Sequence, residues 1–345
     1  MNKIKTKQCL KMIIVGAALG LSNLTFAAAP AYTITDLGDL GGGQAWAQAI
    51  NQAGQVAGLA ATNLQEATVW HAFRWNHGTM TDLGTLPGGT NSSGAAINDR
   101  GQVAGGSDTA SGQNHAVLWS GGSITDLGTL PGGTFSWATG VNNLGQVVGY
   151  CDTASGEWHG FLWSHGTMTD LGMFWPMGIN DRGQAVGSAN TASGGALWSH
   201  GTLTDLGTLP GGRVSGPSAI NARGQVVGWG DTADSQVHAI LWERGAMIDL
   251  GTLAGGDLSQ ATAINDLGQV VGPASTATTG GAAFVYSKAT GMVDLSTLLP
   301  PDSGWLVPTP SGINNRGQIV GIGFKGGFPY IYRRAVLLTP VAAQP

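Results

Sequence analysis

Residues 126–171 read DLGTLPGGTFSWATGVNNLGQVVGYCDTASGEWHGFLWSHGTMTDL, and this stretch decides the fold. It begins and ends with the same Asp-Leu pair, at Asp126 and Asp170. Between the pairs, short apolar runs alternate with turns rich in Gly, Asn and Ser. The turns at 142–145 and 164–166 suit tight hairpins, since Asn bonds its own backbone and Gly accepts a positive φ. We therefore predict four short antiparallel strands, at residues 137–141, 146–149, 159–163 and 168–171.

The same unit recurs along the chain with a period of about 44 residues, which is the main signal in the sequence. Seven Asp-Leu pairs begin at Asp36, Asp82, Asp126, Asp170, Asp205, Asp249 and Asp294. Seven Asn-x-x-Gly-Gln elements follow in the same order, at Asn51, Asn98, Asn142, Asn180, Asn221, Asn265 and Asn314. A third element, His-Ala-Phe-x-Trp or a variant of it, begins at His71, His115, His159 and His238.

Seven units of four antiparallel strands predict an all-β fold, a seven-bladed β-propeller. A solenoid of stacked coils is the competing repeat architecture, but its coils are usually shorter and lack two tight hairpins per unit. The order of the strands favours the propeller. The first predicted strand, residues 34–37, corresponds to the fourth strand of a unit, and the last unit ends near its third strand, around residues 330–338. The N-terminal strand would therefore complete the last blade and close the ring.

The repeated motifs resemble those of the bacterial extracellular HAF-repeat proteins. The similarity rests on Asp-Leu-Gly-Thr-Leu-Pro-Gly-Gly, on Ile-Asn-x-x-Gly-Gln-Val-Val-Gly and on His-Ala-Phe-x-Trp, and it covers almost all of the chain after its first segment. The ending at residues 335–340 is also similar to the way in which such chains finish. The resemblance implies export and a propeller-like repeat fold. It brings no catalytic residues with it.

Composition agrees with a globular, turn-rich chain. Of 345 residues only 10% are charged, against a usual quarter, while 58 are Gly and 14 are Pro. Apolar residues make up 42% of the chain and include 12 Trp, which leaves ample surface to bury. The excess of glycine reflects several copies per repeat, at hairpins and in Gly-Gly loops, so it records repeated architecture rather than low complexity.

The first 27 residues have the features of a secretory signal peptide. Four lysines, at positions 3, 5, 7 and 11, precede an apolar stretch over residues 12–21, and small residues follow at Thr25 and Ala27. We predict cleavage after Ala27, a secreted protein in the medium or the periplasm, and a single propeller domain over residues 28–345. An uncleaved membrane anchor is the weaker alternative, since the apolar core is well short of about 20 residues.

Removal of this segment changes both the charge and the cysteine count. Loss of four lysines leaves 11 basic against 20 acidic residues, a net charge of −9. That charge argues against a nucleic-acid partner, which needs cationic contacts to phosphate. Cys9 leaves with the signal and Cys151 remains alone, so neither a disulfide framework nor a cysteine zinc site is expected. We expect no cofactor, no membrane span and a monomer.

The repeated polar residues are more consistent with structure than with chemistry. Histidine is a common metal ligand, but one His per unit would be spread around a ring. Asp108, Asp152 and Asp231 lie seven residues before a repeated His, which predicts a hydrogen bond from His to this turn Asp. The Asp of each Asp-Leu pair could serve acid–base chemistry, but seven equivalent copies lack the distinct environments that separate two pKa values. The repeated Trp of the third strand is expected to pack between sheets.

A binding site is best sought where one copy departs from the others. Two residues before each repeated Asn stands Ala or Gly, which suits a crowded strand next to the ring axis. The position five residues before the Asn varies, and its three tryptophans would form an aromatic platform at the central mouth for a sugar or another flat apolar face. The alternative is that they fill the widening end of the ring. The predicted ligand-binding residues are Trp46, Trp137, Trp175, Arg213, Asp257 and Gln260.

The fourth unit is shorter than the others, because it lacks the Pro-Gly-Gly loop before Trp175, and this predicts a notch at the mouth. We therefore expect a secreted binding or scaffold module for a glycan or an extracellular protein. One alternative is a secreted polysaccharide hydrolase or lyase, for which Asp39, Asp257 and His77 are the candidate groups. Another is a purely structural surface protein. The sequence names neither the ligand nor a role for Cys151.

Overall fold

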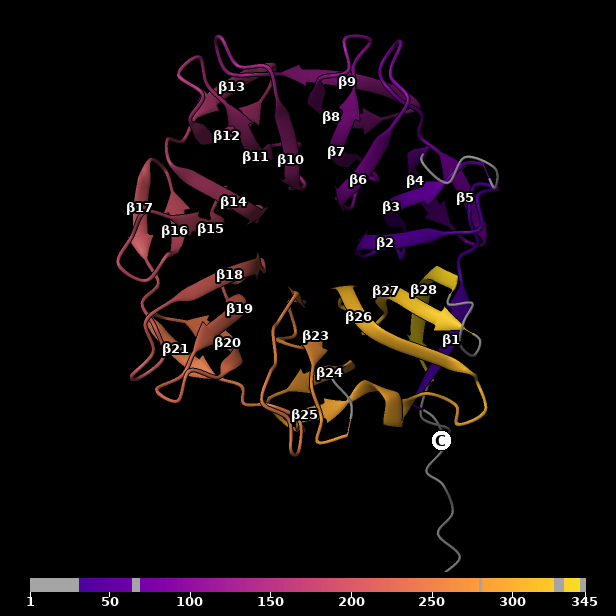
Figure 1. Cartoon of the computed structure of the whole chain (residues 1–345), viewed down its shortest axis with the longest axis vertical. Helices are drawn as coiled ribbons and strands as arrows, with labels where there is room; N and C mark the ends of the chain where they lie inside the picture. The colour runs from indigo at the N-terminus through magenta and orange to yellow at the C-terminus, as the bar shows by residue number, and fades with distance from the viewer. Residues whose placement is uncertain (1–30, 64–68, 279–280, 326–331, 342–345) are drawn as a thin grey trace, which may run out of the picture.

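The chain forms a ring of seven four-stranded antiparallel sheets, which is a seven-bladed β-propeller (Figure 1). This computed structural model describes residues 31–63, 69–278, 281–325 and 332–341. The predicted signal peptide lies outside the described residues. In each of the first six blades the strands follow one another in sequence order, from the axis outward, as the pattern of hairpins predicts.

Strand bounds are as follows, blade by blade. Blade 1 holds β2 (Ala45–Ile50), β3 (Val56–Ala61), β4 (Trp70–Asn76) and β5 (Thr79–Asp82). Blade 2 holds β6 (Ser92–Ile97), β7 (Val103–Asp108), β8 (Asn114–Ser120) and β9 (Ser123–Gly128). Blade 3 holds β10 (Ser136–Val141), β11 (Val147–Asp152), β12 (Trp158–Ser164) and β13 (Thr167–Asp170). Blade 4 holds β14 (Phe174–Ile179), β15 (Ala185–Ala189), β16 (Gly195–Ser199) and β17 (Thr202–Asp205).

The remaining blades have the same plan with small departures. Blade 5 holds β18 (Ser215–Ile220), β19 (Val226–Asp231), β20 (Val237–Glu243) and β21 (Ala246–Asp249). Blade 6 holds a two-residue β22 (Ala263–Ile264), then β23 (Val270–Ala274), β24 (Ala282–Ser287) and β25 (Gly291–Asp294). A short 3-10 helix, η1 (Leu295–Leu298), leads to blade 7, which holds β26 (Trp305–Ile313), β27 (Ile319–Lys325), β28 (Tyr332–Pro340) and β1 (Tyr32–Asp36).

The predicted closure of the ring by the N-terminal strand is confirmed. Strand β1 pairs with β28 along its whole length, from Tyr32 opposite Pro340 to Asp36 opposite Val336. The order of the last sheet is therefore β1-β28-β27-β26. Because the two ends of the chain share one sheet, the first and last strands of the propeller are held together by backbone hydrogen bonds rather than by side-chain contacts alone.

The innermost strands are crowded, which explains the small residues that recur in them. Strands β2, β6, β10, β14, β18 and β26 lie nearest the axis (Figure 1), and β22 is the corresponding first strand of blade 6. A Cβ added to Gly140 of β10 would lie 3.3 Å from the Cα of Gly178 in the next blade. Contacts this short leave room for glycine or alanine and for little else. The close packing of the inner strands thus explains why a small residue stands two positions before each repeated Asn.

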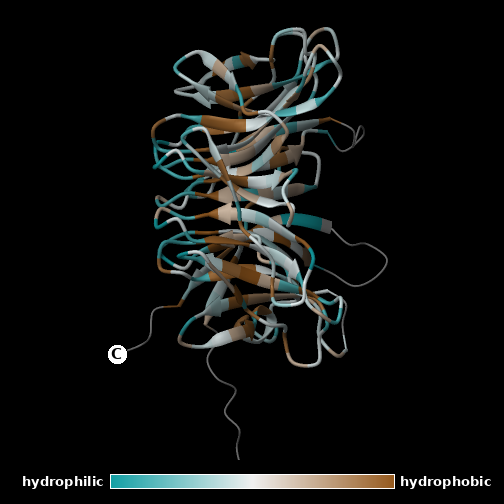
Figure 2. Cartoon of the chain, turned by 90° about the vertical axis from the view of Figure 1, so that its left-hand side faces the viewer, coloured by the Kyte–Doolittle hydropathy of each residue, from teal (hydrophilic) through white to brown (hydrophobic). Residues whose placement is uncertain are grey.

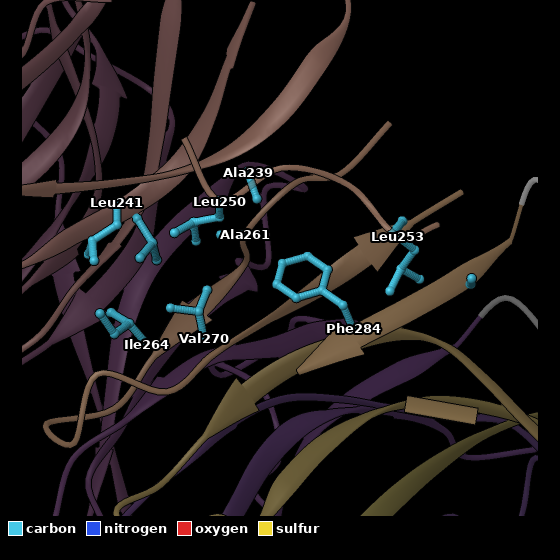
Figure 3. Packing of buried hydrophobic residues seen from close by; sticks show 11 residues of the cluster. Ala239, Leu241, Leu250, Leu253, Ala261, Ile264, Val270 and Phe284 are labelled. Carbon is cyan, nitrogen blue, oxygen red and sulfur yellow. The ribbon is translucent and has the colours of Figure 1, made fainter. Parts of the chain in front are cut away.

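The core consists of apolar layers between neighbouring blades. In the layer between blades 5 and 6, Leu241 and Leu250 pack with Val270 and Phe284, and all four are buried (Figure 3). Full burial of a side chain such as Phe284 stabilises the fold by about 1.5–3 kcal/mol. In side view the hydrophobic residues lie mainly within the strands, and the turns are largely hydrophilic (Figure 2). None of the described helices has the length and apolar character needed to span a membrane.

A closed circle of side-chain hydrogen bonds links all seven blades at the face formed by the first hairpin of each blade. The Nδ2 of each repeated Asn donates to the backbone carbonyl of the repeated Asn in the next blade, at 2.9–3.1 Å. Each Nδ2 also donates to the Gln four residues later in its own hairpin, as Asn142 does to Gln146 at 2.8 Å. All seven Asn side chains are buried. The most regular motif of the sequence therefore joins the blades to one another.

Candidate ligand-binding pocket between blades 1, 2 and 3

The position five residues before each repeated Asn lies on the inner strand and pairs with a residue of the second strand. Blade 2 is unusual at both of these positions. Trp46 lies opposite Leu59 in blade 1, and Trp137 lies opposite Tyr150 in blade 3. In blade 5 the glycine at this position is covered by the ring of its partner on the second strand, Trp229. Blade 2 pairs Ser93 with Gly106, so two small residues lie opposite each other where every other blade has at least one larger residue.

Both of these small residues line a pocket with a volume of about 350 Å³. Trp46, Leu59 and Trp70 of blade 1 form one wall, and Trp137 of blade 3 forms another. Polar groups come from blade 2, whose contribution includes Asn91 and Asn114. The volume lies at the lower end of the roughly 300–1,000 Å³ that is usual for small-molecule sites. The lining residues carry no formal charge in the described part of the chain.

The ring of Trp46 is held between two neighbours. Its centroid lies 5.1 Å from that of Trp70, with the two planes tilted by 41°. The guanidinium of Arg333, on β28, lies 5.7 Å from the centre of the Trp46 ring, which is the geometry of a cation–π contact. Strand β28 of blade 7 therefore helps to fix one wall of the pocket.

Trp137 leans from blade 3 over the second strand of blade 2. A Cβ added to Gly106 would lie 2.3 Å from Cε3 of Trp137 and 2.7 Å from Oδ1 of Asn114. Any side chain at this position would collide with both groups, so glycine is required for this arrangement. Gly106 thus lets the aromatic wall and the amide of Asn114 approach the same spot.

Two polar atoms of residues that line this pocket have no hydrogen-bond partner in the described part of the chain. They are Nε1 of Trp46, a donor, and Oδ1 of Asn114, an acceptor. Only Nε1 of Trp119 and Oγ1 of Thr191 share this state among the described residues. A buried polar group left unpaired costs about 1–3 kcal/mol. Such groups are rare in folded proteins, and two of them around one apolar pocket indicate a place where a ligand can bind.

The structure brings together two of the six predicted ligand-binding residues. Trp46 and Trp137 line the pocket, whereas Trp175 is half-buried on β14 and is not among its lining residues. Arg213 is exposed before blade 5, and its backbone N–H donates to Asp231. The carboxylate of Asp257, in blade 6, accepts a hydrogen bond of 2.8 Å from the Ser275 hydroxyl. Gln260 is also in blade 6, outside the pocket lining.

The pocket lies between blades, whereas the sequence placed the site at the central mouth. The central channel has a volume of about 270 Å³ and is lined mainly by small inner-strand residues such as Ala49, Gly140 and Gly312. At the hairpin face a polar hollow of about 230 Å³ is lined by six of the seven repeated Asn residues and by Asp99, among others. No Trp lines either hollow among the described residues.

The predicted hydrogen bond between His and the turn Asp is wrong. Each repeated His instead binds the Asp of the following Asp-Leu pair through Nδ1, at 2.8–2.9 Å, in the pairs His71–Asp82, His115–Asp126, His159–Asp170 and His238–Asp249. The register of the outer hairpin brings these residues together across the two strands, which sequence spacing alone does not reveal. The pairing also accounts for His71, which has no turn Asp seven residues before it.

The turn Asp has a different structural role. Asp152 accepts hydrogen bonds of 2.7 Å from the backbone N–H groups of Thr134 and Phe135, and it thereby fixes the loop that enters the same blade. Asp108 does the same for Thr90 and Asn91. Asn91 lines the blade 1–3 pocket, so Asp108 helps to hold part of its rim.

The groups considered for an enzyme do not converge. Asp39 accepts hydrogen bonds from the backbone of Gly41 and Gly43 and pairs with Arg334. His77 is in the outer turn of blade 1 and contacts Asn76, whereas Asp257 is in blade 6. Within the described residues no cluster of three His, Cys, Asp or Glu side chains has metal-binding geometry. The structure instead has a pocket with apolar walls and a few uncharged polar groups.

Comparisons with known proteins agree with the propeller fold and identify no family for this chain. No protein-family model matches the chain, and no curated protein does either. A Mycobacterium tuberculosis puromycin-hydrolyzing peptidase of solved structure is similar over 90% of this chain, with 14% identity and a TM-score of 0.50. This chain spans 55% of the length of that peptidase. YCF48, solved with a D1 peptide, matches over 96% of this chain and all of its own, with 9% identity and a TM-score of 0.49. At such identities the likeness concerns architecture alone.

Proposed function

We propose that this protein is an exported binding module that holds a neutral glycan in the pocket between blades 1, 2 and 3. The observation that carries the proposal is the pair Ser93 and Gly106, which opens a hollow between aromatic walls at a position that is filled in neighbouring blades. A pyranose ring has one flat apolar face and a rim of hydroxyl groups. Tryptophan walls suit that face, because aromatic rings bury a large area in a fixed geometry.

Polar groups support a glycan over a purely apolar ligand. Sugar hydroxyls both donate and accept hydrogen bonds, so one ligand can satisfy Nε1 of Trp46 and Oδ1 of Asn114 together. Both atoms are covered by protein, so the proposal requires the two side chains to turn toward the ligand when it binds. The lining residues are uncharged, which favours neutral over acidic sugars, because an unpaired charge buried among tryptophans would be costly. Arg333 packs on the ring of Trp46 but is not itself a lining residue.

The test is to fill the pocket without disturbing the fold. In Ser93→Trp the new ring would occupy a position where blades 1 and 3 already carry Trp46 and Trp137, so the variant should fold. We expect wild type to bind members of a neutral glycan array and Ser93→Trp to bind at least tenfold more weakly, since a filled pocket excludes the ligand. Thr309→Trp is the matched control, because Thr309 is exposed at the equivalent position of blade 7 and should leave binding unchanged.

Two results would contradict the proposal. One is a folded Ser93→Trp protein that binds the same glycans with wild-type affinity. The other is a wild-type protein that binds no neutral glycan, which would favour a structural role or a protein ligand. The export part of the proposal rests on the pattern of residues 1–27 and on the similarity to HAF-repeat proteins. It is tested separately by mass spectrometry of the protein from a secreting host, where the mature chain should begin at residue 28.

A further inference from the structure

Beside the pocket, blade 3 carries a cluster of aromatic side chains that the fold does not explain. Four of the five blade 2 residues that line the pocket are Asn91, Ser93, Gly106 and Asn114. In blade 3 the equivalent positions, 44 residues later, are Phe135, Trp137, Tyr150 and Trp158. Polar and small residues in one blade are thus replaced by four rings in the next.

Three of these rings contact one another and form what we term the blade 3 platform: Phe135, Tyr150 and Trp158. The rings of Phe135 and Tyr150 are stacked with centroids 6.1 Å apart, and the Trp158 centroid lies 5.3 and 5.9 Å from theirs in T-shaped contacts. Yet 43% of the surface of Trp158 remains exposed. A large aromatic side chain held in place by its neighbours and open to solvent is typical of a binding surface.

Trp137 joins the pocket to the platform. It forms one wall of the pocket, and it lies directly opposite Tyr150 in the register of β10 and β11. Residues directly opposite in an antiparallel pair project from the same side of the sheet. The aromatic surface therefore continues from Trp46 and Trp70, across the hollow of blade 2, to Trp137 and the platform. The residues that form it are uncharged.

We propose that the pocket and the blade 3 platform are two subsites of one groove that binds a linear, neutral oligosaccharide. The pocket would hold one sugar ring among its three tryptophans. A further unit of the same chain would lie on the platform with its flat face against Trp158. This inference rests on the proposed function, and it adds that the ligand is a polymer rather than a single sugar or a short branch tip. An acidic glycan fits less well, since the residues that form the surface are aromatic and uncharged.

The experiment is a chain-length series measured by isothermal titration calorimetry with the mature protein. The probes are two neutral linear series, from glucose to cellohexaose and from N-acetylglucosamine to its hexamer. We expect affinity to rise with chain length until both subsites are filled, and then to level off. Trp158→Ala should weaken binding of the long oligomers about tenfold and leave that of the shortest binding member unchanged, because only the second subsite is lost.

Trp229→Ala is the matched control, since Trp229 is the blade 5 equivalent of Tyr150 and lies outside the groove. It should change neither affinity nor its dependence on chain length. Phe135→Ala is a second variant that disrupts the platform, because loss of that ring removes its contacts with Tyr150 and Trp158. It should reduce the gain from chain length in the same way as Trp158→Ala.

The results distinguish a groove with two subsites from a pocket that binds alone. If short and long oligomers bind equally, and Trp158→Ala changes neither while Ser93→Trp abolishes both, the pocket acts alone and the groove is overturned. If Trp158→Ala weakens every length equally and also lowers the melting temperature, the platform is structural and the groove is likewise overturned. If wild type binds neither these series nor any neutral glycan of the array, the proposed function itself fails.

Discussion

The side chain of Asn314 in blade 7 donates a hydrogen bond of 3.1 Å to the backbone carbonyl of Asn51 in blade 1. These residues are 263 positions apart in the chain, and their contact closes a circle that the other six Asn residues complete. Oδ1 of Asn314 also accepts from the backbone N–H groups of Arg316 and Gln318. One buried amide thus shapes its own hairpin and joins the last blade to the first.

The first prediction concerns this closing contact. Asn314→Ala should lower the free energy of unfolding by about 1–3 kcal/mol, because it leaves buried backbone groups without partners. Urea denaturation monitored by tryptophan fluorescence measures the change. Leu267→Ala is the control, since Leu267 is 61% exposed in the equivalent hairpin of blade 6 and should cost less than about 0.5 kcal/mol. Equal stability of Asn314→Ala and wild type would show that the circle is not needed.

The sequence predicts the architecture well because its repeats are built from local turns. The Asn-Asn-Leu-Gly turn ends in Gly145, whose φ of +79° is the left-handed conformation that the hairpin requires. Seven such turns and the outer hairpin of each unit are enough to predict the blades. The N-terminal strand, which corresponds to the fourth strand of a unit, is enough to predict ring closure. Each of these features depends on residues that are neighbours in the chain.

Contacts between strands and between blades were harder to predict. His159 and Asp170 meet through the register of the outer hairpin, and the sequence instead suggested Asp152, which occurs in the same units. The pocket exists because Ser93 and Gly106 are jointly small, and neither is conspicuous alone. Their effect depends on Trp137, which reaches over from the next blade. A search for pairs of small residues at equivalent positions of two strands would have revealed it.

The second prediction concerns acid stability. Burial of the Asp152 carboxyl favours its neutral form, but hydrogen bonds from Phe135 and Thr134 outweigh this and hold its pKa below the ordinary value. The pKa of Asp108 is lowered in the same way: burial raises it, but hydrogen bonds from Asn91 and Thr90 outweigh that effect. A pKa that is lower in the folded state contributes stability that is present above about pH 4, the region of the unfolded pKa. That stability is lost as the pH falls through the folded pKa.

Asp152→Asn should therefore lose less stability than wild type as the pH falls from neutral to below about 3. Urea unfolding at a series of pH values gives the two curves, and the gap between them should narrow toward acid. Asp234→Asn is the matched control, because Asp234 is an exposed residue of the equivalent turn in blade 5. Curves for wild type and Asp152→Asn that stay parallel over the whole range would contradict the prediction.

A third prediction concerns Cys151, whose role the sequence left open. Its side chain is fully buried in the layer between blades 2 and 3, and Sγ lies 3.7 Å from the carbonyl oxygen of His159. Burial raises the pKa of this thiol to about 11. The thiolate is the reactive form, so the native protein should react with a thiol reagent at pH 8 only as fast as it unfolds.

Labelling in strong denaturant should give one thiol per mature chain, and the Cys151→Ala variant should give none in either state. Alanine should be tolerated here, because Ala189 occupies the equivalent position of blade 4. Rapid stoichiometric labelling of the native protein would show that the thiol is accessible and would contradict its assignment to the core.

The last prediction concerns the strand that closes the ring. Arg334 on β28 occupies the position at which blade 3 has His159, and Asp36 on β1 occupies that of Asp170. Arg334 Nε lies 3.1 Å from Asp36, and its Nη1 pairs with Asp39 and donates to the carbonyl of Gly43. An arginine therefore anchors the N-terminal strand with more hydrogen bonds than a histidine can supply.

Arg334→Ala should lower the free energy of unfolding by about 1–2 kcal/mol, a value reduced for the quarter of the arginine side chain that remains exposed. Arg334→His should recover part of this loss, because it restores the His–Asp pair of the other blades. Both variants are compared by urea unfolding and by limited proteolysis, in which Arg334→Ala should lose β1 first. If β1 is cleaved no faster than in wild type and stability is unchanged, backbone pairing with β28 alone closes the ring.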